Sequence, residues 1–150
     1  MKVATLLLVG TMLVGSLAAP GLGGELPTCF GRSVTLPGTS EPDSGSGTTD
    51  EHNVMMGFAG DDELYGANLA DFICGGAGND PALIGYRGAD RLSGNSGSDT
   101  LVGGAGADRI LGRRGDDTIT GGPGIDYIDG GLGTDTCVAD PEDTVANCEL

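Results

Sequence analysis

Nine aspartates recur along the chain at an almost constant interval, and their carboxylates are the groups best able to do chemistry. A carboxylate can bind a cation or exchange a proton. Every step between neighbouring members is nine residues, except the step of ten from Asp80 to Asp90. A fixed period indicates that one repeated structural unit places every member in the same way. The nine are Asp62, Asp71, Asp80, Asp90, Asp99, Asp108, Asp117, Asp126 and Asp135.

Each aspartate belongs to a unit that opens with glycine, as in GGAGADRIL at residues 103–111. Nine such units cover residues 57–138. The fourth position is also glycine in every unit but one, where Leu69 replaces it. An apolar residue or cysteine stands two positions after each aspartate, provided that Pro81 is the insertion in the ten-residue unit. These positions are Leu64, Ile73, Leu83, Leu92, Leu101, Ile110, Ile119, Ile128 and Cys137.

The elements that would position these carboxylates are tight turns and short strands. The six residues G-x-x-G-x-D suit a turn, because glycine adopts a positive φ without steric cost and leaves its carbonyl uncovered. The next three, such as Arg109 to Leu111, suit a short strand with Ile110 inside and Leu111 facing out. Two turns and two strands complete one coil, so units two apart stack. The sequence therefore predicts an all-β fold, a parallel β-roll with two nonapeptide units per coil.

Stacking would sort the aspartates into two ladders, which we call the first and the second. Neighbours on a ladder would lie roughly 4.8 Å apart, and carboxylates that close repel one another. A hard divalent cation removes this repulsion, and Ca²⁺ accepts both carboxylate and backbone carbonyl oxygens. The alternative is a metal-free solenoid in which each aspartate caps its own turn. The first ladder is Asp62, Asp80, Asp99, Asp117 and Asp135, and the second is Asp71, Asp90, Asp108 and Asp126.

The number of expected ions follows from the spaces between stacked turns. Four spaces lie in the first ladder and three in the second, so the roll would hold at most about seven Ca²⁺. Mg²⁺ fits less well because it demands octahedral geometry and retains its waters. Zn²⁺ is disfavoured because only His52 and cysteines that are expected to be paired could supply nitrogen or sulfur ligands.

The unit resembles the RTX, or haemolysin-type calcium-binding, nonapeptide G-G-x-G-x-D-x-U-x, in which U is a large aliphatic residue. The resemblance covers residues 57–138 and is nearly perfect at 103–111, 121–129 and 130–138, apart from Cys137 at U. It implies Ca²⁺ held between successive turns by the nine aspartates and by turn carbonyls. The implied carbonyls are those of Gly75, Ala77, Gly94, Ser96, Gly103, Ala105, Gly112, Arg114, Gly121, Pro123 and Gly130.

Two units depart from the family pattern, and they are expected to hold ions poorly or to distort the coil. One carries Leu69 and the other carries the inserted Pro81. The chain is similar to the small exported calcium-binding repeat proteins of actinobacteria, which also carry cysteines near both ends. Toxin activity, known from other RTX proteins, is not implied for this chain.

The segments outside the repeats have different expected roles. Residues 1–19 are expected to form a signal peptide, with Lys2, an apolar run and a small-x-small site at 16–18, which favours an extracellular protein over a membrane-anchored one. Residues 20–56 are expected to hold an N-terminal cap and degenerate repeats. Within them, 38–46 fits a decayed unit and a polar linker equally well. Residues 139–150 show no period and are expected to form a C-terminal cap or tail.

The net charge limits the possible binding partners, and the cysteine content suggests disulfides. The chain has 22 acidic and seven basic residues, and loss of the signal would leave six arginines and a net charge of −16. This charge argues against a nucleic-acid partner, since phosphate binding needs clustered basic residues, and no membrane insertion is expected after signal removal. Four cysteines in an exported chain suggest two disulfides. We favour Cys29–Cys74 with Cys137–Cys148 over the other two connectivities and over free thiols.

The function expected from these features is calcium binding by a secreted, non-enzymatic protein that folds when Ca²⁺ binds. The residues 57–138 contain neither a G-x-S-x-G nor an H-E-x-x-H motif, and the single histidine, His52, lies in a polar segment. The alternative is an extracellular adhesive module in which calcium is structural and an exposed face binds glycan or protein. Outward side chains that could form such a face are Tyr65, Tyr86, Arg113, Arg114 and Tyr127.

Overall fold

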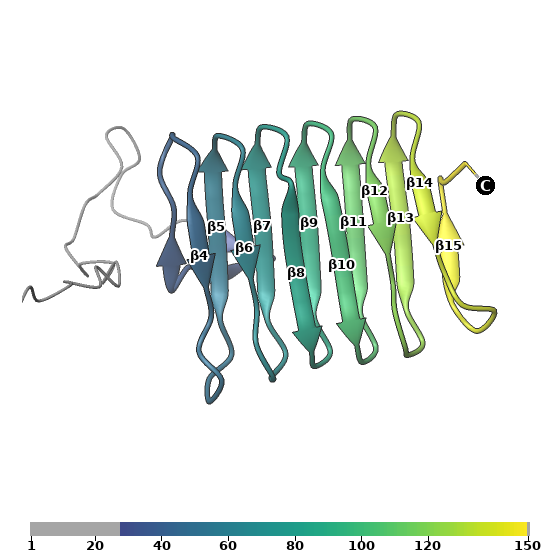
Figure 1. Ribbon diagram of the computed structural model, residues 1–150, viewed down its shortest axis with the longest axis horizontal. Helices are drawn as coiled ribbons and strands as arrows, with labels where there is room; N and C mark the ends of the chain where they lie inside the picture. The colour runs from purple at the N-terminus through teal and green to yellow at the C-terminus, as the bar shows by residue number, and fades with distance from the viewer. Residues whose placement is uncertain (1–27, 150) are drawn as a thin grey trace, which may run out of the picture.

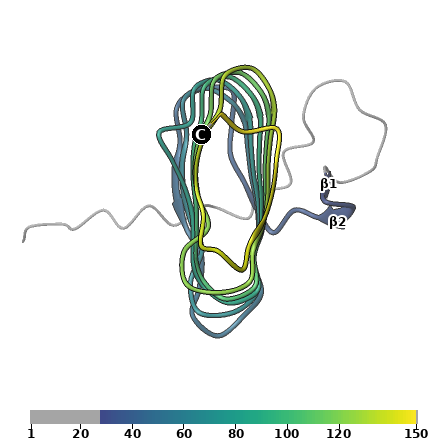
Figure 2. The same cartoon turned by 90° about the vertical axis from the view of Figure 1, so that its right-hand side faces the viewer.

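The computed structural model describes residues 28–149, and every regular element in that range is a β-strand. The expected signal peptide, residues 1–19, lies outside the described residues. In the described part no helix could span a membrane. Two parallel sheets face each other, and the chain alternates between them so that each coil contributes one strand to each sheet (Figures 1 and 2). The predicted parallel β-roll is therefore confirmed.

One sheet has six strands and the other has seven. The six-stranded sheet contains β4 (Ser44–Ser46), β6 (Glu63–Tyr65), β8 (Ala82–Arg87), β10 (Thr100–Ala105), β12 (Thr118–Thr120) and β14 (Thr136–Val138). The seven-stranded sheet contains β3 (Leu36–Pro37), β5 (Val54–Ala59), β7 (Phe72–Ala77), β9 (Arg91–Ser96), β11 (Arg109–Arg114), β13 (Tyr127–Leu132) and β15 (Thr144–Ala146).

The strand register confirms that units two apart stack. Ile110 of β11 pairs with Leu92 of β9 and with Ile128 of β13. Leu101 pairs with Leu83, so Pro81 is the insertion and the coil re-enters register after it. The apolar side chains of both sheets meet between the sheets and are almost fully buried, each stabilising the fold by roughly 1.5–3 kcal/mol. This core comprises Met55, Leu64, Ile73, Leu83, Leu92, Leu101, Ile110, Ile119 and Ile128.

The roll extends beyond the nine clear units at both ends. Gly45 of β4 pairs with Leu64, and Met55 of β5 pairs with Ile73. Residues 38–56 therefore contribute strands to both sheets. After residue 138, where the sequence shows no period, β15 pairs with β13 and Glu149 bridges to Thr136.

Both favoured disulfides are present. Cys29–Cys74 ties a hairpin of β1 (Thr28–Cys29) and β2 (Arg32–Ser33) to the seven-stranded sheet. The hairpin stands beside the roll (Figure 2). Cys137–Cys148 joins the last strand of the six-stranded sheet to the C-terminal segment. The C-terminal bridge therefore fixes the roll at its edge strand β14, whereas Cys74 lies on β7, an inner strand between β5 and β9.

Candidate metal centre

The nine repeat aspartates form the two predicted ladders, and all nine are at most 3% exposed. In each rung, Oδ1 of one aspartate accepts a hydrogen bond from the backbone amide of the aspartate one coil earlier. The amide of Asp90 donates to Asp108, and the amide of Asp108 donates to Asp126, each at 2.8 Å. The first ladder repeats this contact, with Asp80 donating to Asp99 at 2.9 Å. One carboxylate oxygen is thus used to join successive coils.

The ladders continue into residues outside the nine units. At the N-terminal end the amides of Asp43 and Asn53 donate to Asp62 and Asp71. At the C-terminal end Asp143 and Glu149 accept from Asp126 and Asp135. Asp43 lies in the segment 38–46, which also fits a decayed repeat unit. Asn53 lies 18 residues before Asp71, so the period could have identified it. Asp143 lies 17 residues after Asp126, and Glu149 lies 14 residues after Asp135. These separations do not follow the repeat, so the period could not identify the two residues.

The second carboxylate oxygen has a different environment. Oδ2 is buried in eight of the nine aspartates and has no hydrogen-bond partner among the described residues. A buried polar atom without a partner is rare and costly, so each one calls for an explanation. The eight are Asp62, Asp80, Asp90, Asp99, Asp108, Asp117, Asp126 and Asp135.

Burial also opposes ionisation of seven of these carboxylates. It raises the pKa of Asp90 and Asp99 to about 7, and the pKa of Asp80 and Asp108 to about 6. The amide hydrogen bond from the preceding coil lowers each pKa, but by less than burial raises it, and neighbouring carboxylates raise it further. Burial likewise raises the pKa of Asp62, Asp117 and Asp126 above the ordinary value. A nearby positive charge would remove this penalty.

Glycine keeps a space open beside each free Oδ2, as the unit at 103–111 shows. A Cβ on Gly103 would lie 2.5 Å from Oδ2 of Asp108 and 2.8 Å from the carbonyl oxygen of Gly121 in the next coil. We call this space between an aspartate Oδ2 and a next-coil carbonyl a cradle. Only glycine leaves it open, because any side chain would place a carbon atom within it.

Seven cradles combine a free Oδ2 with a next-coil carbonyl. In the first ladder these are Asp62 with Gly75, Asp80 with Gly94, Asp99 with Gly112, Asp117 with Gly130 and Asp135 with Asn147. In the second ladder they are Asp90 with Gly103 and Asp108 with Gly121. The carbonyl of Asn147 was not among those implied by the sequence, because the tail shows no period.

Two aspartates of the second ladder differ from the rest. Oδ2 of Asp71 accepts a hydrogen bond from the amide of Ala67 at 2.8 Å, so this carboxylate caps its own turn. It belongs to the unit in which Leu69 replaces the second glycine. Asp126 has a free Oδ2, but no next-coil carbonyl stands beside Gly121. These two positions offer fewer oxygen donors than the seven cradles.

The implied turn carbonyls fall into two groups. Six first-position glycines, from Gly75 to Gly130, present their carbonyls to cradles. The third-position carbonyls accept hydrogen bonds from fourth-position glycine amides of the preceding coil, as Ala77 does from Gly60 at 2.9 Å. The third-position group is Ala77, Ser96, Ala105, Arg114 and Pro123. A carbonyl has two lone pairs, so this hydrogen bond leaves one free for a ligand.

The donor set is made of hard oxygen atoms. Within residues 28–149 no three acidic, histidine or cysteine side chains converge on one point. Each cradle instead pairs one carboxylate oxygen with backbone carbonyls. Ca²⁺ takes ligands of this kind, whereas Zn²⁺ requires nitrogen or sulfur. The residues present therefore fit calcium.

Comparison with known proteins gives one match. The family model of the RTX calcium-binding nonapeptide repeat (four copies) matches residues 48–80, 84–119 and 111–141. No curated protein and no solved structure matches the chain. The matched segments cover more than half of the 150 residues and contain all nine ladder aspartates.

Proposed function

Because the chain belongs to the RTX calcium-binding nonapeptide repeat family, we propose that it is an exported, non-enzymatic protein whose roll folds when Ca²⁺ binds. The observation that carries this proposal is the row of buried Oδ2 atoms that have no hydrogen-bond partner in the part of the chain that the structure describes. Bound Ca²⁺ would supply the positive charge that lets these carboxylates remain ionised while buried. Each ladder aspartate would hold an ion through Oδ2 and keep Oδ1 on the neighbouring coil's amide.

Folding should depend on the ion for two reasons. The ladder brings ionised carboxylates together, which costs free energy without counter-charge. In addition, the donors of one cradle come from two successive coils, so a complete site exists only in the folded chain. A ligand that binds only the native state stabilises that state. Extracellular calcium modules bind with dissociation constants of roughly 10⁻⁴–10⁻³ M, which suits folding after export.

Export is proposed from residues 1–19, whose pattern is that of a cleaved signal peptide. The repeat family itself is defined by calcium binding rather than by catalysis. His52, the one histidine, is exposed and lies with Nδ1 2.7 Å from the carbonyl oxygen of Ala70. These features support an extracellular calcium-binding role without enzymatic activity.

Circular dichroism of the full mature chain during a Ca²⁺ titration tests the proposal. After chelation, we expect the β signal to be weak and to recover cooperatively as Ca²⁺ is added, with Mg²⁺ as the control ion. Calorimetry on the same sample should count about seven bound ions, one for each complete cradle. A β signal that is unchanged by chelator, or that recovers equally with Mg²⁺, would overturn it.

A further inference from the structure

The turns of the roll fall into two classes, which differ in the backbone at their second position. Eight turns hold the second-position residue at a positive φ, whether it is glycine or a larger residue. These eight turns are also the ones whose aspartate has an Oδ2 without a hydrogen-bond partner in residues 28–149. A positive φ at this position therefore goes together with a free Oδ2. The eight second-position residues are Phe58, Gly76, Tyr86, Asn95, Gly104, Arg113, Gly122 and Gly131.

The second-position amide explains this correspondence, because it points in different directions in the two classes. With a positive φ it turns to the next coil, as the amide of Gly104 donates to the carbonyl oxygen of Gly121 at 2.9 Å. In the other class it turns inward, as the amide of Ala67 donates to Oδ2 of Asp71 at 2.8 Å. The remaining two turns of this class repeat the inward contact, from Thr48 to Asn53 and from Thr39 to Asp43.

Asn53 adds a second contact of its own, because its side-chain nitrogen stands where a cation would stand in later turns. Asn53 takes the place of the ladder aspartate and is 5% exposed. Its Nδ2 donates to the carbonyl oxygens of Thr48 and Glu51, each at 3.2 Å, and to Oδ1 of Asp71 at 2.8 Å. A Cβ on Gly47 would lie 2.5 Å from this nitrogen, so Nδ2 fills the space beside the first-position glycine. Two turn carbonyls and a ladder carboxylate are thus satisfied by an amide group.

The three turns with an inward amide lie at the N-terminal end of the roll, and the hairpin of β1 and β2 covers this part. Cys29 of the hairpin is fully buried and packs with Val54, Phe72 and Cys74 on the outer face of β5 and β7. The guanidinium of Arg32 on β2 lies over the ring of Phe72, 4.3 Å from its centroid. The disulfide from Cys29 to Cys74 closes this segment and restricts its unfolded state. This part of the chain therefore has a second core that is independent of the ladders.

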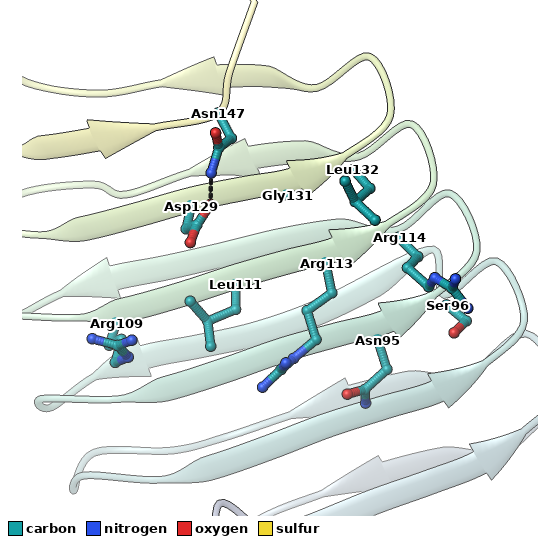
Figure 3. Close-up of a pocket in the computed structure, with 10 residues that line it drawn as sticks. All are labelled: Asn95, Ser96, Arg109, Leu111, Arg113, Arg114, Asp129, Gly131, Leu132 and Asn147. Atoms are coloured by element: carbon teal, nitrogen blue, oxygen red, sulfur yellow. Dashed lines mark hydrogen bonds between the residues drawn. The ribbon is translucent and has the colours of Figure 1, made fainter.

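Farther along the same sheet the outer face is hollowed instead of covered. Over β9, β11 and β13 it carries a hollow of about 720 Å³, lined among others by Asn95, Arg109 and Arg113 (Figure 3). Leu111 also lines this hollow and faces outward, as predicted. Beyond residue 77 the coils are therefore held by strand pairing, by the inner core and by ladders whose carboxylates need a counter-charge.

We propose that residues 28–77, which we call the amide-capped end, fold without calcium and serve as the template on which the calcium-dependent coils form. This inference rests on the proposed function, since it states which coils require the ion. At the amide-capped end the hydrogen bonds of Asn53 and Ala67 replace the contacts that Ca²⁺ would make. The cradle of Asp62 remains there, so calcium would tighten this end without being required for it. Repeat proteins grow from a folded neighbour, and β7 offers its edge to β9.

Hydrogen exchange of the mature chain, with both disulfides intact, tests the proposal by mass spectrometry of its peptides. In chelator we expect amide protection to persist in residues 28–77 and to be lost in residues 78–149, whereas excess Ca²⁺ should protect both. Equal loss of protection along the chain would overturn the proposal and leave calcium-dependent folding intact. Full protection of both segments in chelator would overturn the proposed function, and this inference with it.

Asn53→Asp tests the role of the side-chain nitrogen. The variant loses the three contacts of Nδ2 and places a second carboxylate against Asp71. In chelator we expect residues 28–77 to lose their protection, and Ca²⁺ should restore it. Asn79→Asp is the matched control, because its oxygen can still accept from the amide of Ser98, a contact of 2.8 Å. Protection in chelator that survives Asn53→Asp would contradict the assigned role.

Gain of an ion is the complementary test, and it does not depend on the folding of Asn53→Asp. Ala67→Gly/Leu69→Gly restores the two glycines of the repeat, so the second position can take a positive φ and turn its amide away from Asp71. The carbonyl oxygen of Gly85 already lies 2.6 Å from where a Cβ on Gly66 would be. Calorimetry should count one Ca²⁺ more than in the wild type, and protection of residues 28–77 in chelator should fall.

The control for this variant is Ala59→Gly/Ala77→Gly, which adds two glycines at third positions of neighbouring turns. Its ion count should equal that of the wild type, since the second-position amides are unchanged. An ion count in Ala67→Gly/Leu69→Gly no higher than in this control would overturn the link between the second-position backbone and ion binding.

Discussion

The amide of Asp108 donates to Oδ1 of Asp126 at 2.8 Å, while Oδ2 of each carboxylate has no hydrogen-bond partner within residues 28–149. The two oxygens of one side chain thus have separate tasks. Oδ1 joins successive coils, and Oδ2 faces the space in which we propose that calcium binds. This division allows the two tasks to be tested separately.

Asp108→Asn should remove one calcium site and leave the ladder intact. The asparagine oxygen can still accept from the amide of Asp90, but the negative charge is lost. Calorimetry should count one ion fewer, and the Ca²⁺ concentration at the folding midpoint should rise. Asp129→Asn, which makes the same charge change outside the ladders, is the control. An unchanged ion count in Asp108→Asn would contradict the assignment.

Gly103→Ala should block a cradle sterically. The new Cβ would lie 2.5 Å from Oδ2 of Asp108 and 2.8 Å from the carbonyl oxygen of Gly121. We expect the calcium-bound protein to lose about 1–3 kcal/mol of unfolding free energy, as for overpacked cores. Gly45→Ala is the control, because a Cβ there meets only the Leu64 side chain at 3.4 Å. Equal denaturation midpoints for the two variants would show that the cradle tolerates a methyl group.

Without calcium the protein should gain stability when the pH falls. Burial raises the pKa of Asp80 and Asp108 to about 6 and of Asp90 and Asp99 to about 7, above roughly 3.9 in an unfolded chain. The folded state therefore binds more protons between these values, and the resulting stability is full below about pH 4 and lost as the pH rises to about 7. Circular dichroism in chelator should show more β structure at pH 4.5 than at pH 7.5.

The double variant Asp90→Asn/Asp99→Asn is the control for this pH dependence, since it removes two of the titrating groups. Its calcium-free stability should change less with pH. With Ca²⁺ present the dependence should reverse, because protons compete with the ion for the same oxygens. Calcium-free stability that increases from pH 5 to pH 8 would argue against the buried, metal-free carboxylate arrangement.

Removal of the C-terminal disulfide should weaken the last coil. Cys137→Ser/Cys148→Ser opens a short loop, with a sequence separation of 11 residues, and should cost about 2–3 kcal/mol. Hydrogen exchange should show the loss first in β14 and β15. Because Glu149 also belongs to this segment, occupancy of the Asp135 cradle should fall in the same variant. Uniform exchange rates along the roll would show that the bridge does not fix its end.

The period of the sequence was enough to predict the coil, the two ladders and the core. Leu83 shows this well, since the insertion at Pro81 could be placed from the apolar positions alone. The parts that could not be predicted depend on contacts between residues whose spacing in the sequence does not follow the repeat. Asp143 and Glu149 reach the ladders from irregular spacings, and Ala67 satisfies Asp71 through a local turn.

The rungs of both ladders point the same way, since each amide donor belongs to the earlier coil and each carboxylate acceptor to the later one. The ladder contacts are therefore kept only when the roll changes in length by whole coils. Excision of residues 100–117, one whole coil, would bring the amide of Asp99 to Asp135 and the amide of Asp90 to Asp126 with no orphaned partner. Asp143 and Glu149 would still accept hydrogen bonds from the last amide of each ladder, whatever the number of coils before them. Such an array can gain or lose whole coils by recombination and still close at its end.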